Sequence, residues 1–454
     1  MTGQRDRWDA IVVGAGPAGS VTALLLARAG ASVLLLDRAR FPRDKPCSEY
    51  LSPGTTTVLA RLGDGVLEAV GRTAHAKLYG MKVVAPSGAA MMGRFATYSF
   101  ALPRTQFDGI LLDAARRAGV IVREGLAVED LVWDRGAVAG VVARSGIGNR
   151  ETGNARVVIG ADGLRSVVAR RLGLVRSSPP RRIAFSAHVA DVAGVDSVGE
   201  LHVGTRGYVG LGPIGGGVTT VALVVPLSAI RAMRAIRRTG ADLRRGFFRE
   251  LERFPGLAGR FDPERVVRDV LVTGPFASWA RRPAVAGALL VGDAADFFDP
   301  FTGQGIYAAL RGAELAAECL IPALTPGTSS PPIPLSVLER GNDVNSPALG
   351  RHYLSPRSPE GRGGQGVRTP EGREGQDVRT ALQGYARARR RAFAGKWLLE
   401  RLIGIGVGWP ALTDRVVRRL ARRPDLADLL VGATGNYIPA ARVLAPSFLA
   451  RLLW

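Results

Sequence analysis

Three glycines near the N-terminus have the spacing that brings a backbone turn close to a phosphate: Gly14, Gly16 and Gly19. The first permits a tight turn, the second lets backbone N–H groups approach a pyrophosphate, and the third lets the following helix pack on the strand. The N-terminus of that helix stabilises the negative charge. Asp37 ends the next apolar run, where a carboxylate accepts hydrogen bonds from ribose hydroxyls. The pattern predicts a dinucleotide site.

Two later segments also place an aspartate directly after a short apolar run. Residues 157–163 read Val-Val-Ile-Gly-Ala-Asp-Gly, and residues 289–295 read Leu-Leu-Val-Gly-Asp-Ala-Ala. The second segment continues through Asp-Pro-Phe-Thr-Gly-Gln-Gly at 299–305 into an expected helix. The glycine triplet alone is compatible with NAD or with FAD. The two later motifs favour FAD.

Cys47 and two histidines are further candidates for chemistry. Cys47 lies in the segment Phe-Pro-Arg-Asp-Lys-Pro-Cys-Ser-Glu-Tyr at 41–50. Its thiol is a candidate proton donor, and the alternative is a small buried apolar side chain. The four histidines, at 75, 188, 202 and 352, stand alone, so no metal site is predicted. His188 and His202 fall in a β-rich stretch, and each is either a general acid or base or a structural residue.

Buried strands and one helix must position the first motif. Residues 9–14 and 32–37 read as parallel strands joined by a helix over roughly 18–29, which makes one βαβ unit. Extended segments between 82 and 100 and a β-rich region between 182 and 273 indicate a second, β-rich domain. A helix is expected over 104–118, a hairpin over 127–143 and a long helix after Gly303.

Composition excludes few classes of function. The chain has 454 residues, of which 46% are hydrophobic, enough for two or three domains. A net charge of +22 permits contact with nucleic acid or an anionic surface. The arginines are spread along the chain without a zinc-finger or RNA-binding motif, so we predict no nucleic-acid partner and leave weak association with a membrane or an anionic carrier open. No apolar run is long enough to span a membrane.

The segment from 325 to 380 differs from the rest of the chain. It is rich in Pro, Gly, Ser and Arg, and Pro-Glu-Gly-Arg recurs at 359–362 and 370–373. We expect a disordered linker, since the segment has few apolar residues to bury. Cys47 and Cys319 are the two cysteines, without disulfide or metal spacing, and no signal peptide is evident, so a cytoplasmic location is expected.

The three motifs, in this order over residues 9 to about 320, resemble the superfamily of p-hydroxybenzoate hydroxylase, flavin-dependent halogenases and geranylgeranyl reductases. The Lys-Pro-Cys at 45–47 resembles the geranylgeranyl-reductase branch, with Ser48 where glycine is usual. The halogenase Trp-x-Trp-x-Ile-Pro signature and the reductase Tyr-x-Trp-x-Phe-Pro element are both absent. The absence of the first signature disfavours halogenation. The absence of the second leaves an isoprenoid substrate unestablished.

The resemblance implies an α/β fold: a Rossmann-type FAD-binding domain, an inserted antiparallel-sheet substrate domain and a helical C-terminal region. The expected segmentation is 1–80, 101–175 and 276–324 for the FAD-binding domain, 81–100 and 176–275 for the substrate domain, 325–380 for the linker, and 381–454 for the helical region. The resemblance also implies that FAD is bound non-covalently and that NAD(P)H is a transient electron donor. Asp293 would hold the ribitol chain, Arg104 would reach the phosphates, and the helix N-terminus near Gly303 and Gly305 would face the flavin ring.

Together, the motifs and the resemblance assign two sets of residues. The catalytic candidate is Cys47. The residues expected to bind the cofactor are Gly14, Gly16, Pro17, Ala18, Gly19, Asp37, Arg38, Lys45, Pro46, Arg104, Asp162, Gly163, Gly292, Asp293, Pro300, Gly303, Gln304, Gly305 and Ile306.

We therefore expect an FAD-dependent oxidoreductase that acts on a hydrophobic small molecule. Reduction of a carbon–carbon double bond is favoured over monooxygenation of an aromatic, polyketide or isoprenoid compound. A non-catalytic FAD-binding electron-transfer protein is the remote alternative.

Overall fold

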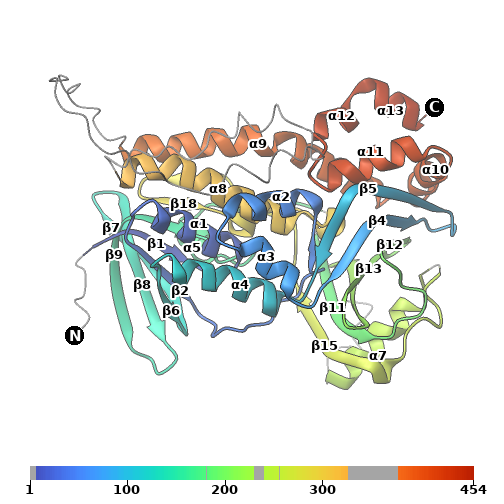
Figure 1. Ribbon diagram of the computed structural model, residues 1–454, viewed down its shortest axis with the longest axis horizontal. Coiled ribbons are helices and arrows are strands. Elements are labelled where there is room, and N and C mark those ends of the chain that lie inside the picture. The colour runs from blue at the N-terminus through green and yellow to red at the C-terminus, as the bar shows by residue number, and fades with distance from the viewer. Residues whose placement is uncertain (1–6, 180, 230–239, 255, 326–376, 454) are drawn as a thin grey trace, which may run out of the picture.

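The computed structural model describes residues 7–179, 181–229, 240–254, 256–325 and 377–453 (Figure 1). The expected linker therefore falls almost entirely outside the described residues. The chain is described again from Asp377, and the next helix begins at Val378, so the last three residues of the expected linker are helical.

A mostly parallel sheet forms the first domain. Its strand order is β17-β18-β9-β1-β2-β6, and β17 alone in this row is antiparallel to its neighbour. The strands are β1 (Trp8–Val13), β2 (Val33–Asp37), β6 (Ile121–Glu124), β9 (Arg150–Gly160), β17 (Ala284–Val285) and β18 (Ala288–Leu290). Segments far apart in the sequence thus lie side by side, which brings the three motifs to one edge of the sheet.

Alternation along β1 explains the two layers that cover this sheet. Ala10 and Val12 belong to the core on the helical side, and Ile11 and Val13 belong to the core on the opposite side. The helical layer contains α1 (Pro17–Arg28), α4 (Arg104–Arg117) and α8 (Gly305–Leu324), with α2 (Pro53–Leu62) and α3 (Val66–Arg72) beside them. The opposite layer contains the hairpin of β7 (Leu126–Asp134) and β8 (Ala137–Ser145), and α5 (Val167–Arg171).

An eight-stranded sheet forms the second domain. Its order is β15-β11-β14-β13-β12-β4-β5-β3, antiparallel except between β12 and β4. The strands are β3 (Tyr50–Leu51), β4 (Ala76–Val84), β5 (Ala90–Ala101), β11 (Arg182–Ala190), β12 (Gly199–Gly204), β13 (Gly207–Gly215), β14 (Val218–Pro226) and β15 (Val266–Thr273). The expected boundary at residue 80 lies inside β4, because pairing with β5 begins at Ala76.

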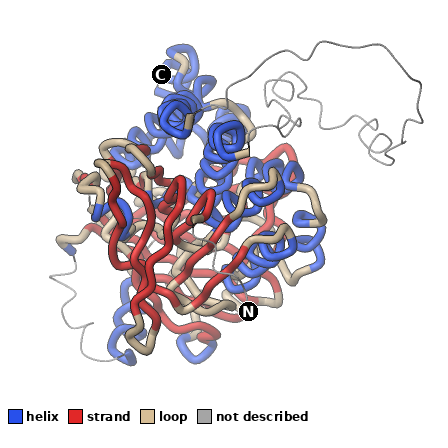
Figure 2. Tube along the Cα trace, turned by 90° about the vertical axis from the view of Figure 1, so that its left-hand side faces the viewer, coloured by secondary structure: helices blue, strands red, loops and turns tan. Residues whose placement is uncertain are grey.

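Smaller elements connect the two domains. A three-stranded sheet contains β10 (Val175–Ser177), β16 (Ser278–Ala280) and β19 (Asp296–Phe297). Helix α7 (Gly240–Leu251) packs beside β15, and short 3-10 turns cover 263–265, 292–294 and 300–302. In Figure 2 the strands run through the left and centre of the view, and most helices lie to the right and above.

The C-terminal helices pack against the rest of the molecule. They are α9 (Val378–Gly406), α10 (Pro410–Ala421), α11 (Pro424–Thr434), α12 (Ala440–Leu444) and α13 (Pro446–Leu453). Helix α9 lies along α8 (Figure 1). The Tyr385 hydroxyl of α9 donates a hydrogen bond to the Leu290 carbonyl of β18 over 2.7 Å. The α/β architecture with a helical C-terminal region is confirmed. Among the described helices, none has the length and hydropathy needed to cross a bilayer.

Candidate active site

The turn after β1 has the geometry of a phosphate-binding loop. Gly14 has φ +99°, and a Cβ there would lie 2.6 Å from the Ala161 carbonyl oxygen. A Cβ at Gly19 would lie only 1.8 Å from the Gly14 carbonyl oxygen. These contacts permit only glycine and hold the first two motifs together, which leaves the N-terminus of α1 facing the cavity.

Asp37 lies beside this turn at the end of β2. Its carboxylate accepts hydrogen bonds from the backbone N–H of Ala15 over 2.7 Å and of Ala39 over 2.8 Å. These bonds fix the carboxylate at the cavity wall, and a carboxylate has further lone pairs for ribose hydroxyls. This arrangement fits the role expected of Asp37.

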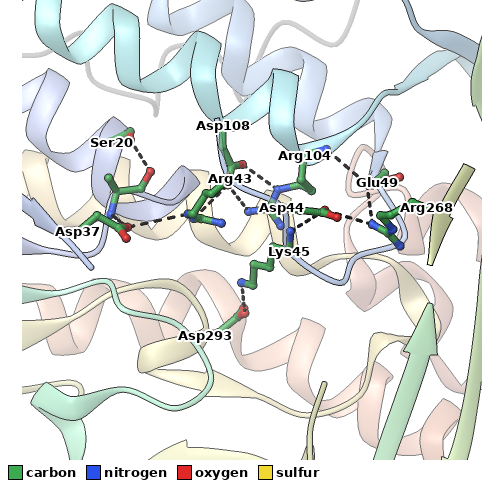
Figure 3. Close-up of polar contacts among 11 residues, drawn as sticks. Ser20, Asp37, Arg43, Asp44, Lys45, Glu49, Arg104, Asp108, Arg268 and Asp293 are labelled. Atoms are coloured by element: carbon green, nitrogen blue, oxygen red, sulfur yellow. Dashed lines mark hydrogen bonds and ion pairs between the residues drawn. The ribbon is translucent and has the colours of Figure 1, made fainter. Parts of the chain in front are cut away.

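Arg43 is a cation at the glycine turn that sequence reasoning did not single out. Its Nη2 lies 3.2 Å from the position of a Cβ on Gly16 and 3.1 Å from Oδ2 of Asp108 (Figure 3). Its Nε is 4.0 Å from Asp37. Arg43 is therefore placed to neutralise an anion bound at the turn. The signal in the sequence was its position two residues before Lys45.

Arg104 is bound to the protein more tightly than expected. Its guanidinium forms two hydrogen bonds with Asp108, of 2.7 and 2.8 Å, and its side chain is almost fully buried. Burial lowers the pKa of Arg104, but the contacts with Asp108 and Cys47 outweigh this effect and raise it above its usual value. Arg104 lines the cavity, and its contact with a phosphate stays a proposal.

The second and third motifs lie side by side, because they follow the paired strands β9 and β18. Lys45 extends its Nζ to 3.4 Å from Oδ2 of Asp293 and lies 3.8 Å from the position of a Cβ on Gly163 (Figure 3). Asp162 caps α5 by accepting a hydrogen bond from Val167 N–H over 2.6 Å. Burial raises the pKa of Asp162 against these hydrogen bonds, and its Oδ1 is a buried atom without a protein hydrogen bond. The polar atoms here converge on one strip of the cavity.

The turn before α8 is held by side chains of the second sheet. Asp299 caps it by accepting a hydrogen bond from Phe301 N–H over 3.0 Å, and it also accepts from Arg182 and the Tyr208 hydroxyl, each over 2.5 Å. Gly303 has φ +65°, and a Cβ there would lie 2.8 Å from the Tyr50 ring. The N-terminus of α8 is thereby held at the cavity.

Gln304 differs from the other residues expected to bind the cofactor. Its side-chain amide is buried and donates to the carbonyl oxygens of Ala433 and Thr434 over 3.3 and 2.9 Å. The side chain therefore connects this turn to α11. Gln304 and Gly19 do not line the cavity, whereas the remaining expected residues do: Gly14, Gly16, Pro17, Ala18, Asp37, Arg38, Lys45, Pro46, Cys47, Arg104, Asp162, Gly163, Gly292, Asp293, Pro300, Gly303, Gly305 and Ile306.

The cavity has a volume of about 1060 Å³ and passes through both domains. One end is the glycine- and aspartate-rich strip. The other end is apolar and lies between the second sheet and the C-terminal helices, with Met81 and Leu201 on the sheet side and Leu399, Leu420 and Phe448 on the helix side. The C-terminal region therefore forms a wall of the site, whereas the expectation from the sequence was only that this region is helical.

Cys47 lies on the loop that runs from Lys45, at the glycine- and aspartate-rich strip, to the second sheet. It is half-buried and lines the cavity, and its carbonyl oxygen accepts from the Ser186 and Thr220 hydroxyls, each over 3.4 Å. Both hydroxyls come from strands of the second sheet. Its side chain contacts Arg104. The loop that carries Cys47 is thus attached to the sheet on one side and to α4 on the other.

His188 lies against the same loop, while His202 does not. The His188 Nε2 is 2.6 Å from Oε2 of the fully buried Glu49, and Arg268 Nη1 is 3.5 Å from the other oxygen of that carboxylate. Arg268 also donates to the Ser186 hydroxyl over 2.8 Å. Glu49 and Arg268 were not singled out from the sequence. Arg268 reaches His188 because β15 pairs with β11, whereas Glu49 comes from the loop that carries Cys47, directly before β3.

His202 belongs to a separate buried cluster. Its Nε2 is 2.8 Å from Glu200, whose carboxylate also receives two hydrogen bonds from Arg260, of 2.9 and 2.8 Å. Burial raises the pKa of Glu200, but the hydrogen bonds from Arg260 and His202 outweigh it and lower the pKa to about 2. This arrangement is typical of a structural ion pair and favours the structural reading of His202.

The chain matches a family model described as FAD binding domain over residues 7–331. It is 32% identical to the menaquinone reductase of Mycolicibacterium smegmatis over 69% of this chain and 76% of the relative. It is 28% identical to the digeranylgeranylglycerophospholipid reductase of Methanosarcina mazei, over 72% of this chain and 78% of the relative.

Solved structures agree with this family. A flavoprotein/dehydrogenase from Cytophaga hutchinsonii has the same fold, with a TM-score of 0.74, 19% identity, and coverage of 97% of this chain and 96% of that one. A myxobacterial chondrochloren halogenase, an FAD-dependent enzyme, gives a TM-score of 0.64 at 25% identity, over 70% of this chain and 75% of that one. The glycine turn, the Asp37 carboxylate and the α8 N-terminus fit FAD along the cavity, so this chain belongs to the FAD-binding-domain family and is an FAD-dependent oxidoreductase.

Proposed function

We propose that this enzyme reduces a carbon–carbon double bond of a hydrophobic small molecule with electrons taken from NAD(P)H. The observation that carries the proposal is that Cys47 lines the same continuous cavity as the strip of glycines and aspartates and the apolar end. A substrate in the apolar end would present its double bond beside the thiol. The polar strip would hold the cofactor.

The residues around the cofactor have distinct tasks in this proposal. The α1 N-terminus and Arg43 bind the pyrophosphate, Asp37 binds a ribose, and Asp293 binds the ribitol chain. When bound, FAD supplies the hydride. Cys47 donates the proton to the second carbon, so one hydride and one proton convert the double bond into a single bond. NAD(P)H docks transiently and restores the reduced cofactor.

The apolar lining supports the choice of a hydrophobic substrate. Aliphatic side chains from the sheet and from α9, α10 and α13 surround the far end of the cavity. The names of the relatives point to isoprenoid compounds, since one acts on menaquinone and another on a digeranylgeranylglycerophospholipid. These two compounds are suitable first probes. A cytoplasmic location and the lack of a nucleic-acid partner stay predictions from the sequence.

Monooxygenation is the second candidate. The likeness to the chondrochloren halogenase favours it, since oxygen chemistry is also found on this fold at 25% identity. The two reactions differ in their use of oxygen. Reduction needs a proton donor and no oxygen, whereas monooxygenation consumes one O2 per product and inserts an oxygen atom.

The test is a two-step anaerobic reaction. The FAD-loaded enzyme is reduced with NADPH or NADH, then mixed with each probe in detergent, and the products are analysed by mass spectrometry. We expect a product two mass units heavier (about 2 Da, one hydride plus one proton) without oxygen. A product that forms only after air is admitted, and that carries an added oxygen, would replace this proposal with monooxygenation.

A further inference from the structure

The C-terminal end of α9 has an apolar face that no part of the described molecule covers. Leu398, Leu402 and Ile405 follow one another at helical spacing on α9, and Trp409 lies three residues after the helix ends at Gly406. The exposed fractions of the four side chains are 50, 46, 56 and 65%. We call these four residues the apolar stripe. Single exposed apolar residues are common on proteins, but three in line on one helix, with a tryptophan just beyond its end, mark an interaction surface.

The apolar stripe lies at an end of the substrate cavity. Leu402 lines the cavity and is also nearly half exposed, so the cavity reaches the surface at this residue. Leu412 and Val416 of α10 and Leu449 and Leu452 of α13 line the same part of the cavity. A hydrophobic molecule entering here would pass from the apolar stripe into an apolar passage.

Exposed basic side chains lie on the two helices that carry or adjoin the apolar stripe. Arg387 and Arg391 lie on the same face of α9, eleven and seven residues before Leu398, and both are exposed. Arg401 is exposed within the stripe region, and Arg418 and Arg422 are exposed on α10. Residues 377–453 contain 14 Lys and Arg against 5 Asp and Glu. The C-terminal helices therefore combine the apolar stripe with an excess of positive charge.

We propose that the apolar stripe docks the enzyme on the surface of an anionic lipid bilayer, with the cavity opening toward the lipid. Apolar side chains on one helix face, with arginines beside them, are the features of helices that lie in a membrane interface. A tryptophan at the end of the apolar stripe suits the headgroup level, where its ring is half in hydrocarbon. Arginines gain free energy from the negative potential of acidic lipids.

Two other occupants fit the surface less well. A second copy of this chain would bring the same positive charges together, which repel one another. An acidic carrier protein would pair with the arginines, but it gives no reason for four apolar side chains beside the opening of an apolar cavity. Binding to the bilayer does not depend on the proposed function. The statement that the bilayer supplies the substrate does rest on it.

The experiment is co-sedimentation of the FAD-loaded protein with vesicles of phosphatidylcholine alone or of phosphatidylcholine mixed with phosphatidylglycerol. We expect binding to the mixed vesicles that weakens as salt is raised, and little binding to phosphatidylcholine alone. The triple variant Leu398→Ser, Ile405→Ser, Trp409→Ser should bind the mixed vesicles about tenfold or more weakly, because it loses three inserted apolar side chains. Arg418→Gln with Arg422→Gln should weaken binding to the mixed vesicles by a similar factor, about tenfold.

A matched control uses three apolar residues that are exposed elsewhere: Trp133, Ile147 and Val267. Their triple serine variant should bind like the wild type, and FAD content verifies that every variant is folded. Equal binding by the stripe and control variants would overturn the docking proposal, as would equal binding to both kinds of vesicle. A dimer in analytical ultracentrifugation that the stripe variant abolishes would assign the face to a second copy instead.

Turnover separates this proposal from the proposed function. Conversion of the probes in detergent without vesicle binding would refute the docking alone. Vesicle binding without conversion of any isoprenoid probe would leave the docking intact and count against the reductase.

Discussion

The guanidinium of Arg104 and the carboxylate of Asp108 form a buried bidentate ion pair on α4, one turn apart. The same carboxylate lies 3.1 Å from Arg43, which stands at the glycine turn. Asp108 therefore holds two arginines, one beside Cys47 and one beside the expected pyrophosphate position. It connects the substrate end of the site to the cofactor end.

Removal of Asp108 should be costly for stability. Asp108→Asn leaves two largely buried guanidinium groups without their carboxylate, which should lower the free energy of unfolding by roughly 3–5 kcal/mol. The measurement is urea denaturation of the cofactor-free protein. Asp113→Asn is the control on the same helix, because Asp113 pairs with Arg116 in solvent, and it should change stability by about 0.5 kcal/mol or less. Similar values for the two variants would contradict the shared role of Asp108.

A methyl group at Gly19 should abolish FAD binding. The Cβ of Gly19→Ala would have to lie 1.8 Å from the Gly14 carbonyl oxygen, so α1 must shift away from the turn that holds the pyrophosphate. FAD content after purification and after reconstitution measures the effect. Gly109→Ala on α4 is the control, because among the described residues no atom outside its own stretch of helix lies within 4 Å of its Cβ position. This variant should retain FAD and gain up to about 1 kcal/mol. A yellow Gly19→Ala protein with one FAD per chain would show that the turn tolerates displacement.

The fold and the glycine- and aspartate-rich strip could be predicted from the sequence, because glycine spacing and buried strands determine the course of the backbone locally. Gly14 and Asp37 occupy the positions that their motifs require. Side-chain networks between distant segments were not predictable in this way. Arg268 reaches Glu49 only because β15 pairs with β11, and no local pattern reports that pairing. The cavity wall made by α9–α13 was not predictable either, since an amphipathic pattern indicates a helix but not the surface against which it packs.

Acid should destabilise the protein partly through Glu200. Its pKa in the folded state is about 2, below the 4.5 of an ordinary glutamate, so its stabilising contribution is complete above about pH 5 and is lost as the pH falls toward 2. This contribution amounts to roughly 3 kcal/mol. Glu200→Gln should therefore lower stability at neutral pH and flatten its decline between about pH 5 and 2.

Chemical denaturation at several pH values measures this effect. Glu151→Gln provides the control, since Glu151 pairs with Arg123 at the surface. A decline with acid that is as steep in Glu200→Gln as in the wild type would remove Glu200 from this account.

The two cysteines should differ in reactivity although both are half-buried. Burial, with a smaller effect of Glu318, raises the pKa of Cys319 to about 11, so at pH 8 only roughly one thiol in a thousand is ionised. Cys47 lines the cavity, where a small reagent can enter. Iodoacetamide at pH 8, followed by mass spectrometry, should label Cys47 first, and bound FAD should slow that labelling. Faster labelling of Cys319, or no protection by FAD, would place Cys47 away from the cofactor.

The most direct test of the central claim compares Cys47→Ala with Cys319→Ala in single turnover under anaerobic conditions. We predict that Cys47→Ala binds FAD and oxidises NAD(P)H nearly as the wild type does, while product formation falls by about 10²-fold, as expected for a lost general acid. Cys319→Ala should form product at the wild-type rate. Full product formation by Cys47→Ala, or a wild-type reaction that consumes one O2 for each product and inserts oxygen into it, would contradict the proposed reduction.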